Sequence, residues 1–234
     1  HFDPGNGSGD FPPLFDPARV RFYATRQGAP RGLGDAIRCG ERFVGDEHFV
    51  VALGDCVIAS HEPAGAIRRM LAAHLAAQAE ATILVQRVAR EATRNYGIVA
   101  PGEQFDETAF VLEDIVEKPG PDAAPSRYAV CARYVFSPMI FNYLRGLQPG
   151  LGAEVQLTDA IRAMIAAGHR VLAAPLQSGE LRLDAGNFES YSRAFVRSML
   201  TDERYGERLR AWAAELLAYL ADPVNPDPDR PGDE

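Results

Sequence analysis

A strand, a helix and a second strand follow one another in the first half of this chain, and they constrain the fold most. Residues 49–53 form a continuous apolar run that ends at a Gly-Asp pair, which is typical of a buried strand in a parallel sheet. Residues 64–80 carry apolar side chains at helical spacing, and residues 82–88 are β-branched and apolar. This order predicts a βαβ unit, and therefore a parallel sheet in an α/β fold.

The rest of the chain continues this plan. The other expected strands are 20–25, 95–100, 109–116, 128–136, 171–176 and 181–183, of which 95–100 and 109–116 form an antiparallel excursion. The other expected helices are 35–42, one begun by Ser137-Pro138, one capped by Thr158 and closed by Gly168, and a helical stretch over 188–221 broken near Gly206. We assign 1–18 to an irregular arm, 19–221 to one domain, and 222–234 to a disordered acidic, proline-rich tail.

Composition excludes several classes of protein. The 234 residues carry a net charge of −8, which argues against nucleic acid as a partner because phosphate binding needs a basic face. No stretch approaches the roughly 18 apolar residues of a membrane span, and the opening residues do not have the pattern of a signal peptide, so we expect neither a span nor a leader. The three cysteines are odd in number and lack C-x-x-C spacing, which indicates buried thiols. We therefore expect a cytoplasmic protein of small-molecule chemistry, without nucleic acid or membrane.

Two aspartates stand where strands are expected to end. Asp55 follows the 49–53 run, and Asp184 follows 181–183. Ligands of parallel sheets bind at the carboxyl ends of the strands, and two carboxylates there could hold Mg²⁺ beside substrate phosphates. Taken singly, each aspartate is more often a turn or cap residue.

Glycines and one lysine add a second set of candidates. Pro30–Gly34 places two glycines at a loop-to-helix junction with Gln27 nearby, and Asn95–Gly97 is a similar short loop; each alone is an ordinary turn. Lys118 is the single lysine among 24 basic residues. A compact ammonium suits one phosphate oxygen in a confined pocket, although a coding bias toward arginine explains the composition equally well.

Taken together, these sequence motifs resemble those of one family. The motifs are Gln27, Pro30–Gly34, Leu53–Asp55, Asn95–Ile98, Asp114–Pro119, Ala124–Ser126, Glu154–Ile161 and Asp184–Gly186. In this order they closely resemble the bacterial UTP–glucose-1-phosphate uridylyltransferases over residues 1 to about 200. The resemblance implies a Rossmann-like three-layer α/β/α nucleotide-diphospho-sugar transferase fold with a mixed, mostly parallel sheet. The Glu154–Ile161 stretch is expected to be structural, at a helix start.

The resemblance also implies roles for the sugar-side residues. Lys118 would hold the phosphate of glucose 1-phosphate. Glu117 would accept hydrogen bonds from glucose hydroxyls, and Gly97 would let the sugar approach the backbone. On the nucleotide side, Gln27 and the backbone at Gly32 would contact uracil.

The implied reaction is the Mg²⁺-dependent transfer of a uridylyl group from UTP to glucose 1-phosphate. Asp55 would ligate Mg²⁺, and Asp184 would complete that site. The sugar-phosphate oxygen would attack the α-phosphorus of UTP in line, and pyrophosphate would leave. Relatives of this kind imply a homodimer or homotetramer.

Three departures from the family stand out. Its opening strand and Gly-rich triphosphate loop have no counterpart in residues 1–30, so we expect a domain lacking its first βα unit and impaired in turnover. Asp35 stands where relatives usually carry histidine, and such a carboxylate would repel a triphosphate. Cys56 follows Asp55, where relatives often carry an acid or a small apolar residue; this is expected to be neutral.

Two alternatives stay open. One is a non-catalytic nucleotide-sugar-binding or regulatory relative, which the DNA upstream of the His1 codon would distinguish from the enzyme. The other is a thymidylyl- or guanylyltransferase acting on a sugar 1-phosphate, which nucleotide competition would distinguish.

Overall fold

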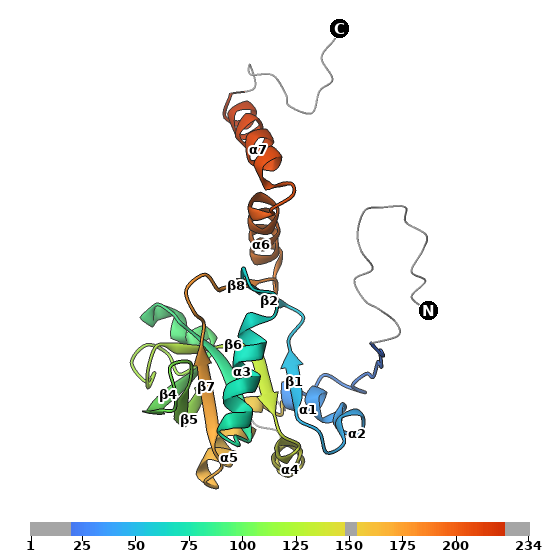
Figure 1. Ribbon diagram of the computed structural model, residues 1–234, viewed down its shortest axis with the longest axis vertical. Coiled ribbons are helices and arrows are strands. Elements are labelled where there is room, and N and C mark those ends of the chain that lie inside the picture. Colours follow the sequence, from blue (N-terminus) through green and yellow to red (C-terminus); the bar gives the residue numbers. More distant parts are fainter. Residues whose placement is uncertain (1–19, 148–153, 223–234) are drawn as a thin grey trace.

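The computed structural model describes residues 20–147 and 154–222, and Figure 1 shows a sheet with helices packed against it. The strands are β1 (Phe49–Ala52), β2 (Cys56–Ala59), β3 (Ala81–Arg87), β4 (Gly97–Gln104), β5 (Phe110–Glu117), β6 (Tyr128–Phe136), β7 (Val171–Pro175) and β8 (Leu181–Asp184). The helices are α1 (Leu33–Arg38), α2 (Glu41–Val44), α3 (Gly65–Ala76), the 3₁₀ helix η1 (Arg90–Asn95), α4 (Met139–Gly146), α5 (Leu157–Ala166), α6 (Phe188–Thr201) and α7 (Gly206–Ala221).

Strand β6 organises the main sheet, whose order is β1-β6-β3-β7-β5-β4 with an additional pairing of β6 to β4. β1 and β3 are each antiparallel to β6, so they run in the same direction without being neighbours. Among the described strands, β3 and β7 form the one parallel pair. The expected mixed sheet is confirmed, but a mostly parallel pairing is wrong, because β6 returns between the two strands of the expected βαβ unit.

The position of β1 also differs from the expectation. Its residues alternate between half-buried and exposed, rather than being buried on both faces. In the part of the chain that the structure describes, β1 pairs with β6 alone and forms the edge of the sheet. The apolar run 49–53 is therefore a half-buried edge strand, since only one of its edges and part of its surface are covered.

Alternation along β3 shows why the fold has three layers. Ile83 and Val85 pack into one core with residues of α4 and α5, whereas Leu84 packs on the opposite face against Met70 of α3. All of these side chains are fully buried. A strand covered on both faces requires a helical layer on each side, and Figure 1 shows α3 crossing one face of the sheet. The expected α/β/α arrangement is confirmed.

Several local expectations fail at short elements. Residues 20–25 form no strand; the Tyr23 ring is exposed and lies 5.3 Å from the Phe43 ring, centroid to centroid. The helix expected over 35–42 is divided into α1 and α2 around Gly40. α4 starts one residue later than expected, and the hydroxyl of Ser137 accepts a hydrogen bond from the Met139 amide.

The C-terminal helices follow the sequence closely. α6 and α7 are separated at residues 202–205, next to the predicted break, and Asn187 begins α6 with a reciprocal capping box to Ser190. Figure 1 shows both helices extending away from the sheet, with α6 next to β8 and α7 next to α6. Large exposed apolar side chains lie along them: Phe188, Tyr191, Phe195, Val196, Leu217 and Leu220.

Some expectations concern residues outside this description. The arm at 1–18 and all but the first residue of the tail at 222–234 lie outside the described residues. Among the helices of 20–147 and 154–222, none is both long and apolar enough to cross a membrane. All three cysteines are free, with Cys56 and Cys131 buried and Cys39 half-buried.

Candidate active site

The candidate site lies where β1 and β4 separate along β6. β1 pairs with residues 133–136 of β6, whereas β4 pairs with residues 128–129. Between these two ladders the register of β6 against β3 shifts, at Ile83 to Val85, and Ala132 has a positive φ of 54°. Such a bulge bends a strand and interrupts its pairing, which is a common arrangement beside active sites.

A cavity of about 170 Å³ opens at this separation. Its lining includes Leu33, Leu53, Gly97, Glu117 and Thr158, which come from five motifs far apart in the sequence. The fold therefore brings five segments together. They are the glycine loop (Pro30–Gly34), the end of β1, the Asn-Tyr-Gly loop, the Glu117-Lys118 pair and the start of α5.

Gly97 and Glu117 form the polar wall of this cavity. They lie opposite each other in the β4–β5 ladder. A Cβ atom added at Gly97 would lie 3.2 Å from Cγ2 of Thr158 and 3.3 Å from Oε2 of Glu117, so any side chain here would fill the cavity. The Glu117 side chain is 34% exposed, which leaves its carboxylate accessible to a hydrogen-bond donor.

Lys118 lies beside the cavity but does not line it. Its backbone is left-handed, with φ 45°, and its amide donates a 3.0 Å hydrogen bond to the carbonyl of Tyr96. Its Nζ lies 3.7 Å from Oε1 of Glu117, and the side chain is 61% exposed. The ammonium therefore projects at the open end of β5, next to the carboxylate.

The glycine loop is held by the segment that precedes α5. Gly32 has φ 91°, and a Cβ there would lie 2.9 Å from the carbonyl oxygen of Val155. The Val155 amide donates to the Arg31 carbonyl at 2.7 Å, and the Gly34 amide donates to the Val155 carbonyl at 2.9 Å. Glycine is required at position 32 because two backbones meet there in a conformation that other residues rarely adopt.

Gln27 and Asp35 interact with each other rather than with the cavity. The Gln27 amide nitrogen donates to the Gly32 carbonyl at 3.2 Å and to Oδ2 of Asp35 at 2.9 Å. Asp35 is buried and pairs with Arg38 at 2.8 Å. The expected repulsion of a triphosphate by Asp35 is thus offset, because its charge is compensated within the protein. Gln27 and Gly32 do not line the cavity, whereas Leu33 between Gly32 and Gly34 does.

Asp55 and Asp184 converge at one end of the small β2–β8 sheet. Asp184 lies opposite Cys56, and the Ala185 amide donates to the Asp55 carbonyl at 2.7 Å. A Cβ added at Gly186 would lie 3.6 Å from Oδ2 of Asp55 and 3.8 Å from Oδ2 of Asp184. The structure therefore brings together the two carboxylates that the sequence analysis paired.

This pair has the donor set of an open magnesium site. Mg²⁺ is usually held by one or two carboxylates together with substrate phosphates, rather than by a closed cage of protein ligands. In residues 20–147 and 154–222 no group of three or more His, Cys, Asp or Glu side chains is placed to hold a metal by itself. Asp55 and Asp184 fit a cation shared with a phosphorylated ligand.

Comparison with known proteins decides the family. The nucleotidyl transferase profile matches residues 11–199. This chain belongs to the nucleotidyl transferase family. It is 35% identical over 198 residues to UTP–glucose-1-phosphate uridylyltransferase 2 of Streptococcus pyogenes serotype M3, in a match that covers 84% of this chain and 65% of the relative. This nucleotidyl transferase thus spans about two thirds of the length of that curated relative.

Solved structures agree with this assignment. A UDP-glucose pyrophosphorylase from Acinetobacter baumannii is similar with a TM-score of 0.71 and 32% identity, over 81% of this chain and 64% of that one. A UDP-glucose pyrophosphorylase complexed with UDP-glucose is similar with a TM-score of 0.67 and 34% identity, over 73% and 63%. The resemblance to the uridylyltransferases drawn from the motifs is confirmed.

Sequence analysis of this nucleotidyl transferase missed two contacts. Thr158 was expected to cap α5, which is wrong: the N-cap is Gln156, and the Thr158 hydroxyl donates to Oε2 of Glu117 at 3.2 Å. Arg182, which was not singled out, contacts both Tyr96 and Asp184. The sequence held a signal for Arg182. It lies two residues before Asp184 on the expected strand, and residues two apart on a strand share one face.

Proposed function

We propose that this nucleotidyl transferase acts on UTP and glucose 1-phosphate, giving UDP-glucose and pyrophosphate with the help of Mg²⁺. The observation that carries the proposal is that Gly97 and Glu117 line one cavity with Lys118 beside it, and that Arg182 connects the Asp55–Asp184 carboxylate pair to this cavity. The names of the similar proteins support the choice of uridine and glucose.

The sugar side follows from the chemistry of the cavity wall. A hexose needs hydrogen-bond acceptors for its hydroxyls and a surface without side chains against which the ring can lie. The Glu117 carboxylate supplies two acceptor oxygens, and Gly97 leaves the space beside them open. Lys118 places a positive charge next to this wall, where the phosphate of glucose 1-phosphate would sit.

The reaction needs positioning and charge neutralisation rather than a covalent intermediate. The phosphate oxygen of glucose 1-phosphate attacks the α-phosphorus of UTP, the new P–O bond forms, and the bond to the β-phosphate oxygen breaks as pyrophosphate leaves. Asp55 and Asp184 would hold Mg²⁺, which when bound neutralises phosphate charge. Lys118 offsets the charge of the attacking phosphate and fixes its orientation.

Nucleotide preference depends on the loop around Gly32. Because the Gln27 amide nitrogen is used within the protein, a contact of Gln27 with uracil would involve its amide oxygen. We assign this loop and Gln27 to the uracil end of the ligand.

Reversal of the reaction tests the function. The chain is incubated with UDP-glucose, pyrophosphate and Mg²⁺, and the release of UTP and glucose 1-phosphate is measured, with dTDP-glucose and GDP-mannose as competing substrates. Preferential use of UDP-glucose supports the proposal. Preferential use of another nucleotide sugar identifies a thymidylyl- or guanylyltransferase. Selective binding of UDP-glucose without turnover matches both a binding relative and the impaired turnover expected without the triphosphate loop, and absence of selective binding contradicts the proposal.

Lys118→Arg is expected to impair the use of glucose 1-phosphate about tenfold while the use of UTP changes little. Arginine keeps the charge, but its planar fork spreads that charge over several donors and presents it differently from the single ammonium that lies 3.7 Å from Glu117. Steady-state kinetics with each substrate varied in turn measure the effect. Equal catalytic efficiency of the variant and the wild type would contradict the assignment of Lys118 to the phosphate.

Thr158→Val is expected to weaken UDP-glucose binding about tenfold, because Glu117 loses a donor that orients its carboxylate at the cavity wall, by analogy with other groups that orient ligand-binding side chains. Valine has the shape of threonine but lacks the hydroxyl that donates to Glu117 at 3.2 Å. Thr158→Ser, which keeps the hydroxyl, serves as the matched control and should bind like the wild type. UMP, which lacks the sugar, should bind all three proteins equally when affinities are measured by calorimetry.

We also propose that the protein is cytoplasmic and forms a homodimer or homotetramer. The apolar side chains exposed along α6 and α7, Leu217 and Leu220 among them, support self-association because contiguous apolar surface is rarely left to solvent. Light scattering coupled to gel filtration measures the mass. A monomer at all concentrations would contradict the oligomeric part of the proposal.

A further inference from the structure

Arg182 lies between the two halves of the candidate site. It is on β8, two residues before Asp184, and its side chain is only 12% exposed. Its guanidinium donates one hydrogen bond to the hydroxyl of Tyr96 at 3.2 Å and another to Oδ1 of Asp184 at 2.9 Å. One planar group thus connects a residue that lines the cavity with a residue of the carboxylate pair.

The contact with Tyr96 is more than a hydrogen bond. The guanidinium carbon lies 5.0 Å from the centre of the Tyr96 ring, so the cation is also within attractive range of the ring electrons. Because a guanidinium is rigid and planar, stacking on one ring fixes the direction in which its donors point. The orientation of Tyr96 and the direction of the bond to Asp184 are therefore linked.

Burial of the Arg182 guanidinium is energetically costly. A buried charge must be paired and hydrogen-bonded, yet Nε of Arg182 is buried and has no hydrogen-bond partner among the described residues. Packing alone would be better served by an apolar side chain of similar volume. The guanidinium is placed instead to hold two partners that belong to different parts of the site.

We propose that Arg182 is a positioning residue that fixes Tyr96 and Asp184 relative to each other, so that the sugar cavity and the carboxylate pair act as one site. This inference rests on the proposed function. It assigns to Arg182 the coupling between the two subsites, because the guanidinium that contacts Tyr96 also holds Oδ1 of Asp184, and the Asp184 carboxylate lies with that of Asp55 around Gly186.

Substitution of Arg182 tests this coupling. UDP-glucose affinity is measured by calorimetry in EDTA and again in Mg²⁺. Arg182→Met keeps the length of the side chain but removes both donors, and we expect about tenfold weaker binding in EDTA and loss of the gain that Mg²⁺ gives the wild type, by analogy with other groups that orient metal ligands. Arg182→Lys should stay impaired, because an ammonium cannot stack on Tyr96 while pairing with Asp184.

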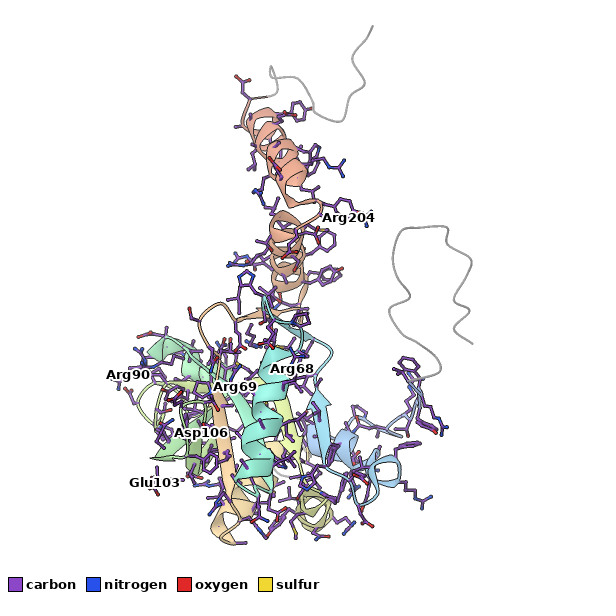
Figure 2. All side chains as sticks on the ribbon, viewed as in Figure 1. Arg68, Arg69, Arg90, Glu103, Asp106 and Arg204 are labelled. Carbon is purple, nitrogen blue, oxygen red and sulfur yellow. The ribbon has the colours of Figure 1, made fainter. Side chains whose placement is uncertain are left out.

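Arg69 provides a matched control. Its side chain on α3, labelled in Figure 2, is 14% exposed, pairs with buried Glu180 at 2.8 Å, and also has a buried Nε without a partner among the described residues. Its hydrogen bonds go to Glu180 and the carbonyl of Pro175, and not to Tyr96 or Asp184. Arg69→Met should lower the free energy of unfolding, as any loss of a buried ion pair does, yet bind UDP-glucose like the wild type.

The possible outcomes separate this inference from the function itself. Wild-type binding by Arg182→Met, full rescue by Arg182→Lys, or an equal loss in Arg69→Met would each overturn the positioning role while leaving the proposed function intact. Absence of UDP-glucose binding by the wild type would overturn both. If Arg182→Met does not fold, Tyr96→Leu carries the test: it removes both the hydroxyl and the ring that Arg182 contacts, and an unchanged gain from Mg²⁺ in that variant contradicts the coupling.

Discussion

Asp55→Asn is expected to abolish Mg²⁺-dependent turnover and to remove the gain in UDP-glucose affinity that Mg²⁺ provides. Asparagine keeps the size of the side chain and one oxygen but removes the negative charge that a hard divalent cation needs. Asp55 and Asp184 are the two carboxylates that converge near Gly186, so the substitution would remove one of the two proposed protein ligands. We expect at least about a 100-fold loss in Mg²⁺ affinity, measured as the Mg²⁺ concentration that half-saturates the effect on binding.

The control is the same substitution at the other end of β1. Asp46 is exposed and precedes the strand, whereas Asp55 follows it. Asp46→Asn changes the net charge of the protein equally and should leave the response to Mg²⁺ unaltered. Equal responses of Asp55→Asn and the wild type would refute the assignment of Asp55 to the metal.

Acidification is expected to destabilise the protein through His74, by about 3 kcal/mol between pH 6.5 and pH 4. His74 is fully buried, and burial together with the nearby His48 lowers its pKa to about 4, although Glu80 partly opposes the shift. In the unfolded chain the imidazole titrates at its ordinary value near 6.5. Between these values the unfolded state binds one more proton than the folded state, so the free energy of unfolding falls as the pH falls.

A variant separates the contribution of His74 to the pH dependence of stability from the contributions of Asp and Glu side chains. His74 is hydrogen-bonded to His48 at 2.8 Å and to the Thr82 hydroxyl at 3.0 Å. His74→Gln retains a group that can both donate and accept but does not titrate. Urea denaturation at several pH values should show a shallower loss of stability in the variant between pH 6.5 and 4, by about 3 kcal/mol. Identical pH profiles would show that His74 does not titrate as its burial requires.

Most of the fold could be predicted because its elements carry strong local patterns. Residues 128–136 were expected as a strand and form β6, and the break between α6 and α7 falls near Gly206 as expected. The place of β6 between β1 and β3 could not be predicted, because it depends on pairing between residues 41 to 87 positions apart in the sequence. The hydrophobic pattern of a strand indicates which of its side chains are buried, but it does not indicate which other strand pairs with it.

For the candidate site too, some features could be predicted from the sequence and others could not. The two aspartates could be located because each was expected at a strand end with a residue type suited to a cation, whereas Gly97 and Glu117 were located through the resemblance to the family. The interactions among the motifs could not be predicted. The donation from Thr158 to Glu117 joins residues 41 apart, and that from Arg182 to Tyr96 joins residues 86 apart. Such contacts arise only when the elements pack together.

The central claim is that the cavity at the β1–β4 separation and the Asp55–Asp184 pair form one site for a uridine-linked sugar and Mg²⁺. Calorimetric titration of this chain with UDP-glucose, with and without Mg²⁺, tests it most directly, and dTDP-glucose and GDP-mannose serve as controls. We predict selective binding of UDP-glucose that becomes tighter in Mg²⁺. Absence of binding, or binding of all three nucleotide sugars with equal affinity and no response to Mg²⁺, would contradict the claim.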